Sequence, residues 1–248
     1  MKKKKIVIVG ATSAMATHCA RLWVQTPSDL TLIGRDRNRL TRIQQDLQTR
    51  SPESRISIKV AQFTDPDEIS LLVHALAKES AIDIALIAHG SLGNQEQSQA
   101  NLSTCRNELE INAISPVLFA EAFANEMEQK GCGTIAVISS VAGDRGRKSN
   151  YVYGASKGLV TRYVQGLQHR FAGTLIKVVL IKPGPTDTPM TASLAAKGAK
   201  LASVDTVAAG IVSAIEHGKA LAYLPTKWGV IMMVIRHLPN FIFNKMNI

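Results

Sequence analysis

The sequence predicts an α/β protein in a single domain, built on a doubly wound parallel sheet. Two observations lead to this prediction: short apolar runs alternate with longer segments of helical apolar spacing, and no repeat or low-complexity tract divides the chain. A length of 248 residues with 46% apolar residues suits one globular domain with a sizeable core. The expected strands are 6–9, 30–33, 56–61, 82–88, 133–139 and 176–181, and the clearest helical segments are 66–79 and 104–128.

The net charge restricts the classes of partner. The chain has 29 Lys and Arg against 19 Asp and Glu, a formal charge of +10, so it should attract anionic ligands or surfaces. Nucleic acid is disfavoured because the sequence has no aromatic-interleaved basic platform, recognition helix or zinc-finger pattern. Phosphorylated small molecules and an anionic membrane surface fit the charge better.

The cysteines and the N-terminus predict a cytoplasmic protein. Cys19, Cys105 and Cys132 are an odd number without metal-type spacing, so no metal site is predicted and a reducing compartment is expected. The N-terminal lysines precede an apolar run that stops at Gly10, too short for a signal peptide. We therefore interpret this run as the first strand of the sheet.

A turn of small residues follows this strand. It reads Gly10-Ala-Thr-Ser-Ala-Met-Ala16 and leads into a helix expected to end near Gln25. A buried strand, a tight turn and a helix N-terminus offer backbone N–H groups and a positive dipole end to a pyrophosphate. The hydroxyl groups of Thr12 and Ser13 can either donate to the phosphates or cap the helix. The predicted nucleotide-binding residues of this turn are Gly10, Thr12, Ser13, Ala14 and Met15.

A second motif combines a serine, a tyrosine and a lysine. Ser140 follows the strand-like run 133–139, and Tyr153 and Lys157 are four residues apart, which places them on one face of a helix. The nearby ammonium group should lower the pKa of the phenol from its usual value of roughly 10. Tyr153 can then exchange a proton with a substrate oxygen that also accepts a hydrogen bond from Ser140, which fits carbonyl reduction. Taken alone, Tyr-x-x-x-Lys also occurs on many solvated helix faces.

Together, these motifs resemble those of the short-chain dehydrogenase/reductase family over nearly the whole chain. The resemblance implies a Rossmann-type fold and a catalytic set of Ser140, Tyr153 and Lys157. It adds Asn112, from the segment Glu110-Ile-Asn-Ala, whose amide would hold a water molecule beside Lys157.

The small-residue turn departs from the family pattern. Only Gly10 remains of three glycines, and Ala14 and Ala16 stand at the other two positions. A left-handed backbone at Ala14 would be strained, so we expect the turn to form without positive φ there.

The resemblance implies NADP as the cofactor, with NAD less favoured. Arg35 stands where an NAD-preferring member has an acid, and its guanidinium suits a 2′-phosphate. Arg37, Arg39 and Arg42 are expected to face solvent, although one of them can help to bind this phosphate. His89 is expected to act as a structural hydrogen-bonder rather than as a catalyst. Besides Tyr153 and Lys157, the resemblance assigns to the cofactor Gln62, Phe63, Ala88, His89, Gly90, Pro183, Gly184, Thr186 and Thr188.

Two segments after the catalytic helix are expected to contact the substrate. By position in the family, residues 191–203 form a mobile helical lid, whose Lys197 and Lys200 either attract a phosphorylated substrate or are ordinary exposed lysines. The C-terminal extension 226–248 is apolar and basic, and its apolar run is too short to span a bilayer. It either lies in the headgroup layer of a membrane or packs against the core or a sister subunit. Its expected contact face consists of Trp228, Ile231, Met232 and Ile235, which recur at helical spacing.

The extension and the segment 140–157 are most similar to one branch of the family, the decaprenylphosphoryl-2-keto-ribose reductases. This similarity implies NADPH-dependent reduction of a lipid-linked 2-keto-pentose, a flavin oxidase as partner enzyme, and a homo-oligomer. It also implies a cytoplasmic protein that is peripheral on the inner face of the cytoplasmic membrane. Two alternatives stay open: a soluble NADPH reductase of another hydrophobic ketone or acyl substrate, and a nucleotide-binding regulator without turnover.

Overall fold

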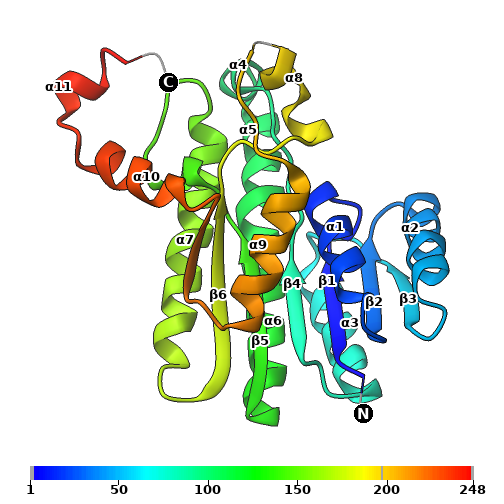
Figure 1. Cartoon of the computed structure of the whole chain (residues 1–248). Helices are drawn as coiled ribbons and strands as arrows, with labels where there is room; N and C mark the ends of the chain where they lie inside the picture. The colour runs from blue at the N-terminus through cyan, green and yellow to red at the C-terminus, as the bar shows by residue number, and fades with distance from the viewer. Residues whose placement is uncertain (1–2, 197, 247–248) are drawn as a thin grey trace.

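The computed structural model describes residues 3–196 and 198–246, which form a seven-stranded parallel sheet between two layers of helices (Figure 1). The strand order is β3-β2-β1-β4-β5-β6-β7, so the order reverses between β1 and β4, as in doubly wound sheets. The strands are β1 (Lys5–Val9), β2 (Asp29–Gly34), β3 (Arg55–Val60), β4 (Ile84–Ile87), β5 (Cys132–Ile138), β6 (Leu175–Pro183) and β7 (Leu221–Leu224).

Helices cover both faces of this sheet (Figure 1). One face carries α1 (Ala14–Trp23), α2 (Arg37–Arg50) and α9 (Val204–Glu216), and the other carries α3 (Pro66–Glu79), α6 (Ser115–Lys130) and α7 (Tyr151–Arg170). Directly before α6 lie α5 (Leu102–Leu109) and the π-helical turn η1 (Glu110–Ile114). The remaining short elements are α4 (Gln95–Ala100), the 3₁₀ turns η2 (Val141–Asp144) and η3 (Pro189–Thr191), α8 (Ala192–Ala196), α10 (Lys227–His237) and α11 (Asn240–Phe243).

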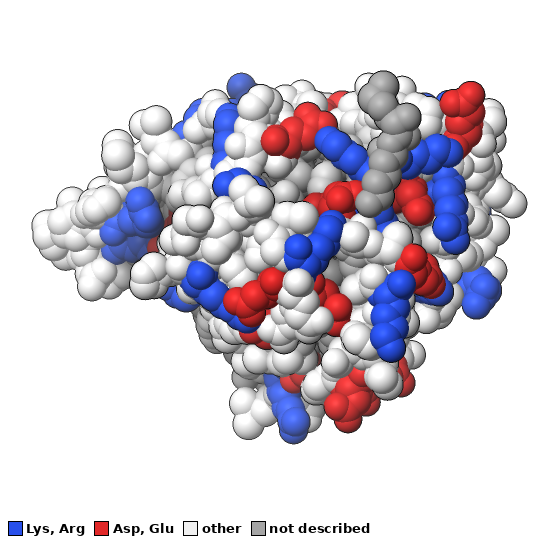
Figure 2. All heavy atoms as spheres, turned by 90° about the horizontal axis from the view of Figure 1, so that it is seen from below, with Lys and Arg blue, Asp and Glu red and all other residues white. Residues whose placement is uncertain are grey.

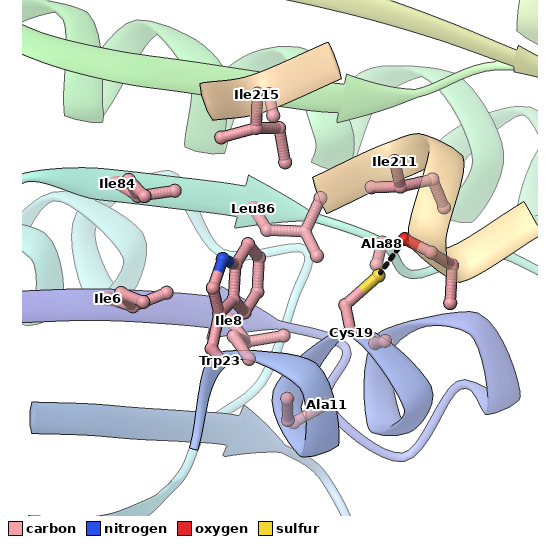
Figure 3. Packing of buried hydrophobic residues seen from close by; sticks show 14 of the residues in the cluster. Ile6, Ile8, Ala11, Cys19, Trp23, Ile84, Leu86, Ala88, Ile211 and Ile215 are labelled. Carbon is pink, nitrogen blue, oxygen red and sulfur yellow. Dashed lines mark hydrogen bonds between the residues drawn. The ribbon is translucent and has the colours of Figure 1, made fainter. Parts of the chain in front are cut away.

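The core has two halves, one on each side of the sheet. Side chains alternate along a strand, so Ile6 and Ile8 point to the layer of α1, α2 and α9, while Val7 and Val9 point to the opposite layer. Figure 3 shows the half of the core that faces α1, α2 and α9, in which Trp23 of α1 lies among the apolar side chains of the central strands. Because both faces are covered, these strands are nearly continuous apolar runs, which is the pattern that identified them in the sequence.

The predicted fold class is confirmed, and the expected strands and helices occur with shifts of about one or two residues at their ends. Helix α3 has the predicted bounds. The unpredicted elements of the described chain include α4, η2, α9 and the edge strand β7, which pairs with the end of β6. The single helix expected at 104–128 is instead α5, η1 and α6 in succession. The C-terminal extension therefore begins directly after a strand of the sheet, and this connection ties it to the core.

The charged side chains are mixed on the face seen from below in Figure 2, where Lys and Arg lie among Asp and Glu. The excess of positive charge is therefore spread over this face rather than gathered in one patch. Among the described residues, no helix has both the length and the apolar character needed to cross a bilayer.

Candidate active site

The loops after β1 and β4 meet at the carboxyl edge of the sheet. A Cβ atom added at Gly10 would lie 2.6 Å from the backbone nitrogen and the Cβ atom of His89, so only glycine allows this approach. Gly10 also has a φ of +79°, a left-handed conformation that costs other residues roughly 1–2 kcal/mol. The predicted cofactor residues 10–15 and 88–90 are thus adjacent where the strand order reverses, the usual nucleotide site of such sheets.

The turn before α1 forms without a left-handed alanine. Every described residue with positive φ is a glycine, so Ala14 enters the helix in an ordinary conformation, as expected. Ser13 occupies the N-cap position, but its side chain makes no capping hydrogen bond. Its hydroxyl group and the first N–H groups of α1 therefore remain available for a phosphate. Arg39 is exposed, as expected, and its Nη2 also donates to the Thr12 carbonyl oxygen at 3.2 Å, so its side chain reaches this turn.

The predicted adenosine-side residues divide into exposed and buried ones. Arg35 and Gln62 are exposed just beyond the carboxyl ends of β2 and β3, where a ribose phosphate and an adenine can reach them. Phe63 is buried instead, with its ring centre 4.7 Å from that of His89 and 5.4 Å from that of Phe119. Its side chain belongs to the core, so only its backbone can face a cofactor.

His89 is a neutral structural residue beside this site. Its Nε2 atom shares a 2.8 Å hydrogen bond with the Ser115 hydroxyl. Burial, together with the positive charges of Lys157 and Arg35, lowers the pKa of His89 to about 3. The imidazole is therefore uncharged at neutral pH and supplies no proton, in agreement with its expected structural role. The preceding residue, Ala88, is also buried.

Ser140 and Tyr153 are brought together by a close crossing of η2 over α7. A Cβ atom at Gly143 would lie 2.6–2.7 Å from the carbonyl group of Lys157, so η2 rests directly on the helix backbone. The Ser140 side chain caps η2 by accepting from the Ala142 N–H at 3.1 Å, and it lies near enough to Tyr153 to lower the pKa of that phenol. The serine and tyrosine predicted from sequence therefore face each other.

The protonation states of Tyr153 and Lys157 allow Tyr153 to act as a proton donor. Lys157 and Tyr153 share a face of α7, with Nζ 5.8 Å from the centre of the phenol ring. Burial raises the pKa of Tyr153, and the hydrogen bond with Ser140 opposes this only in part. The expected lowering of this pKa by Lys157 is therefore wrong, because burial disfavours the phenolate and only Ser140 acts in the opposite direction. Burial lowers the pKa of Lys157 to about 8, so both groups are mainly protonated at pH 7.

Asn112 is fully buried in the π-helical turn, and its amide is held by two residues that sequence reasoning missed. Its Oδ1 accepts from the Ser91 N–H at 2.8 Å, and its Nδ2 donates to Glu108 Oε2 at 2.9 Å and to Ser91 Oγ at 3.2 Å. Protein groups thus engage most of this amide, and the second lone pair of Oδ1 is left for the water that Asn112 was expected to hold. A Cβ atom at Gly90 would lie 2.8 Å from Asn112 Oδ1 and 3.4 Å from Lys157 Nζ, so this glycine keeps the space between them open.

The segment after β6 contains the residues predicted for the nicotinamide side. Pro183, Gly184 and Thr186 are buried, and the Thr186 hydroxyl donates to the Gly184 carbonyl oxygen at 2.9 Å. The Thr188 hydroxyl lies 3.2 Å from that of Thr191 in a capping box at the start of η3. The segment is therefore shaped by its own hydroxyl groups at the same edge of the sheet as Tyr153.

A buried ion pair joins this segment to the loop that carries Ser140. Lys182 Nζ contacts Asp144 Oδ1, with only 3% and 2% of the two side chains exposed. Tyr223 of β7 donates to the other oxygen of Asp144 at 2.7 Å. None of these three residues, which come from η2, β6 and β7, was predicted from the sequence to have a role. Their contacts fix the loops after β5 and β6 relative to each other.

Comparison with known proteins places this site in a family. A family model described as short chain dehydrogenase matches residues 4–199. The chain belongs to the short-chain dehydrogenase family. As such it is an NAD(P)-dependent oxidoreductase. It is 27% identical to an uncharacterized oxidoreductase of Mycobacterium tuberculosis over 96% of this chain and 94% of that one. It is 29% identical to one of Staphylococcus epidermidis over 77% and 81% of the two chains.

Solved structures have the same fold at lower identity. A short-chain type dehydrogenase/reductase from Mycobacterium ulcerans has a TM-score of 0.83, 17% identity, and coverage of 99% of both chains. A short-chain dehydrogenase from Sphingobium yanoikuyae, solved in complex with NADPH, has a TM-score of 0.80, 21% identity, and coverage of 96% of this chain and 97% of that one.

In this short-chain dehydrogenase, the C-terminal extension packs on two segments that adjoin predicted site residues. A Cβ atom at Gly184 would lie only 1.9 Å from Nε1 of Trp228, so the indole of α10 packs directly on the segment after β6. Arg145, from the loop after Ser140, donates to the carbonyl oxygens of Ile235 and Leu238 at 2.6 and 2.5 Å. This places a cation at the C-terminus of α10, where the helix dipole favours it.

Arg145 also holds the last helix of the extension. Its Nη2 donates to Asn240 Oδ1 at 3.0 Å, and its guanidinium carbon lies 3.8 Å from the ring centre of Phe243. One side chain five residues after Ser140 therefore fixes both α10 and α11.

The exposed face of the extension differs from the predicted one. Met232 is fully buried, and Trp228 and Ile235 are half-buried against the protein, so three of the four predicted contact residues face the core of their own chain. In Figure 1, α10 and α11 project from the body at the upper left, and their outer side is apolar. The exposed apolar residues of this outer face are Val230, Ile231, Met233, Val234, Phe241 and Ile242.

The predicted lid, residues 191–203, begins at the last residue of η3 and contains α8. Lys200 is exposed, and Lys197 lies outside the described residues, as do the last two residues of the extension. Residues 192–196 are half-buried or exposed, and the isolated bridge between Thr186 and Ala202 holds the end of this segment near the site.

Proposed function

We propose that this short-chain dehydrogenase uses NADPH to reduce the 2-keto group of a polyprenylphosphoryl pentose to a secondary alcohol. The proposal rests on the two sides of the C-terminal extension, which differ in what they contact. Its inner side packs on both active-site loops, while its outer side is apolar and exposed, with Lys227, Arg236 and Lys245 exposed on the same segment. A ketone linked to a lipid through a phosphate needs such a surface beside its proton donor.

The site residues supply a proton and an orientation for this reaction. The cofactor, when bound, supplies the hydride. Protonated Tyr153 transfers its proton to the carbonyl oxygen, and the Ser140 hydroxyl donates a hydrogen bond to the same oxygen. The ammonium group of Lys157 stabilises the phenolate that remains. We include Asn112 in the path that returns a proton to the pair, with Ser91 and Glu108 fixing its orientation.

NADPH is proposed as the cofactor because an exposed arginine, rather than an acid, follows β2. The turn before α1 offers N–H groups and the Ser13 hydroxyl to the pyrophosphate. Arg35 has no ion pair among the described residues, so its charge is available to a 2′-phosphate. The similar Sphingobium structure also contains NADPH.

Arg35→Asp should reverse this preference, because attraction to the 2′-phosphate becomes repulsion. We expect NADPH to bind at least about tenfold more weakly and NADH to bind as well as before or better, as measured by fluorescence titration. Arg162→Asp makes the same charge change at an exposed position of α7, on the opposite face of the sheet from α2, and serves as the control. Tighter binding of NADH than of NADPH by the unchanged protein would show that the cofactor assignment is wrong.

The outer side of the extension is proposed to contact the inner face of the cytoplasmic membrane. Replacing Val230, Val234 and Phe241 by Ser removes apolar surface without touching the inner side. We expect the variant to fold and to reduce small ketones normally, but to lose most binding to anionic vesicles and most turnover of the lipid-linked substrate. Leu71→Ser with Leu175→Ser, two residues about equally exposed elsewhere, is the matched control.

Vesicle binding by the unchanged protein should also weaken with salt, since exposed charges are screened beyond roughly 8–10 Å at ordinary ionic strength. If the unchanged protein ignores vesicles at every salt concentration, the proposed membrane contact is wrong. A soluble NADPH reductase of another hydrophobic ketone would then be the better assignment. That alternative has one observation in its favour, which is that the inner side of α10 already packs on its own chain.

Two partner proposals follow from the substrate. The ketone must be made by oxidation of an alcohol, and we propose a flavin oxidase as the enzyme that supplies it. A homo-oligomer is also proposed. A regulator without turnover is disfavoured, because Ser140, Tyr153 and Lys157 are placed together with a protonated phenol.

A further inference from the structure

Three buried polar atoms without a hydrogen-bond partner lie around the start of the catalytic helix. Among the described residues, five buried side-chain nitrogen or oxygen atoms lack a partner: Trp23 Nε1, His89 Nδ1, Gln95 Nε2, Arg147 Nε and Asn150 Oδ1. Trp23 and His89 are surrounded by apolar and aromatic side chains. The other three come from α4 and from the loop that leads into α7.

Gln95 and Asn150 are attached to the first turn of α7, which carries Tyr153. Gln95 Oε1 accepts from the Val152 N–H at 3.0 Å, and the Asn150 carbonyl oxygen accepts from the Gly154 N–H at 2.8 Å. Asn150 occupies the N-cap position of α7, yet its side chain makes no capping hydrogen bond, because Gln95 caps the helix in its place. The side-chain oxygen of Asn150 and the side-chain nitrogen of Gln95 are thereby both left without a partner.

Arg147 lies three residues before Asn150 in the loop that leads into α7. The Asn150 N–H donates to its carbonyl oxygen at 3.1 Å, and its Nη2 contacts Met232 Sδ of α10 at 3.6 Å, a weak acceptor. The nearby carboxylate of Asp144 is already engaged by Lys182 and Tyr223. Burial lowers the pKa of Arg147, and Asp144 opposes this only as the smaller influence.

A folded protein rarely leaves such atoms unpaired, because each costs about 1–3 kcal/mol. Binding of a ligand that supplies the missing partners would recover this cost. A hydroxyl group both donates and accepts, so it matches the free acceptor of Asn150 and the free donor of Gln95, and an anion matches Arg147. We propose that Gln95, Asn150 and Arg147 form a polar subsite beside Tyr153 that recognises the hydroxyl groups and the phosphate of a hydroxylated ketone. This inference rests on the proposed carbonyl reduction and names the residues that select its substrate.

The test compares three ketones: 2-hexanone, ribulose and ribulose 5-phosphate. Gln95→Glu keeps the oxygen that caps α7 but removes the free donor, and Asn150→Ala removes the free acceptor. We expect each substitution to lower kcat/KM for ribulose and ribulose 5-phosphate about 10- to 100-fold. The value of kcat/KM for 2-hexanone and the melting temperature should be nearly unchanged. Arg147→Met should abolish the preference for ribulose 5-phosphate over ribulose, whereas Lys148→Met, its exposed neighbour, should not.

The results separate this inference from the function on which it rests. The subsite would be overturned if kcat/KM fell equally for all three ketones. It would also be overturned if Asn150→Ala lowered the melting temperature but left the ratios of kcat/KM between the ketones unchanged, because Asn150 would then be an ordinary structural residue. Failure of the unchanged protein to oxidise NADPH with any ketone would instead overturn the proposed function. A farnesylphosphoryl 2-keto-pentose, tested beside ribulose 5-phosphate, shows whether the phosphate comes from a lipid or from a free sugar, and dependence on Arg147 in either case supports the subsite.

Discussion

Replacing Tyr153 by Phe is expected to lower the rate of ketone reduction at least about a hundredfold, the usual scale for loss of a general acid. The change removes the transferable proton but little volume, so the fold and the binding of NADPH should be preserved. The structure strengthens this expectation, because burial raises the pKa of Tyr153 and keeps the phenol protonated at neutral pH. Single-turnover oxidation of NADPH with 2-hexanone, with cofactor affinity measured separately, gives the result.

Tyr151→Phe is the matched control, since this tyrosine starts the same helix but is exposed and hydrogen-bonds Gln99 rather than Ser140. It should reduce ketones at the normal rate. Near-normal rates for Tyr153→Phe would mean that another group supplies the proton, and the mechanism derived from the site would have to be abandoned.

Replacing Lys182 by Met is expected to lower the free energy of unfolding by about 3–5 kcal/mol, the usual cost of leaving a buried charge without its partner. Asp144 would keep only the hydrogen bond from Tyr223, and its carboxylate is almost completely buried. The loop after Ser140 would also lose its tie to the segment at Pro183, so reduction should become slower. Urea unfolding and steady-state kinetics measure the two effects.

Two comparisons make this second result decisive. Lys177→Met removes an exposed lysine from the same strand and should change the free energy of unfolding by less than about 0.5 kcal/mol. Asp144→Asn combined with Lys182→Met removes both charges and should recover much of the lost stability. A loss below about 1 kcal/mol for Lys182→Met alone would show that the buried pair does not hold the two loops together.

The fold could be predicted because strands covered on both faces leave an apolar run in the sequence, and the intervening helices leave a period of 3.6 residues. The approach of Ser140 to Tyr153 was predicted from the spacing of these residues and the family resemblance, whereas the contact of Gly10 with His89 was not predicted. The strand β7 was missed because its four residues merge with the apolar extension that follows. Helix α9 was passed over, although its buried residues have ordinary helical spacing.

The supporting residues of the site could not be predicted, because they act over long separations in sequence. Lys182 and Asp144 are 38 residues apart, and Arg145 contacts Leu238 across 93 residues. The spacing of Tyr153 and Lys157 showed that they are neighbours, but not how deeply they are buried. Burial decides the direction in which the pKa of Tyr153 shifts. The inner side of α10 was likewise mistaken for the outer one, because an apolar helix shows its orientation only against its partner.

The proposed reduction of a lipid-linked 2-keto-pentose with NADPH can be tested directly. The most direct measurement incubates the purified protein with NADPH and a synthetic polyprenylphosphoryl 2-keto-pentose in anionic vesicles, and follows both the absorbance of NADPH and the lipid product by mass spectrometry. We predict one NADPH oxidised for each ketone converted to the alcohol, with no conversion by Tyr153→Phe. Absence of conversion by a protein that reduces 2-hexanone under the same conditions would contradict the claim.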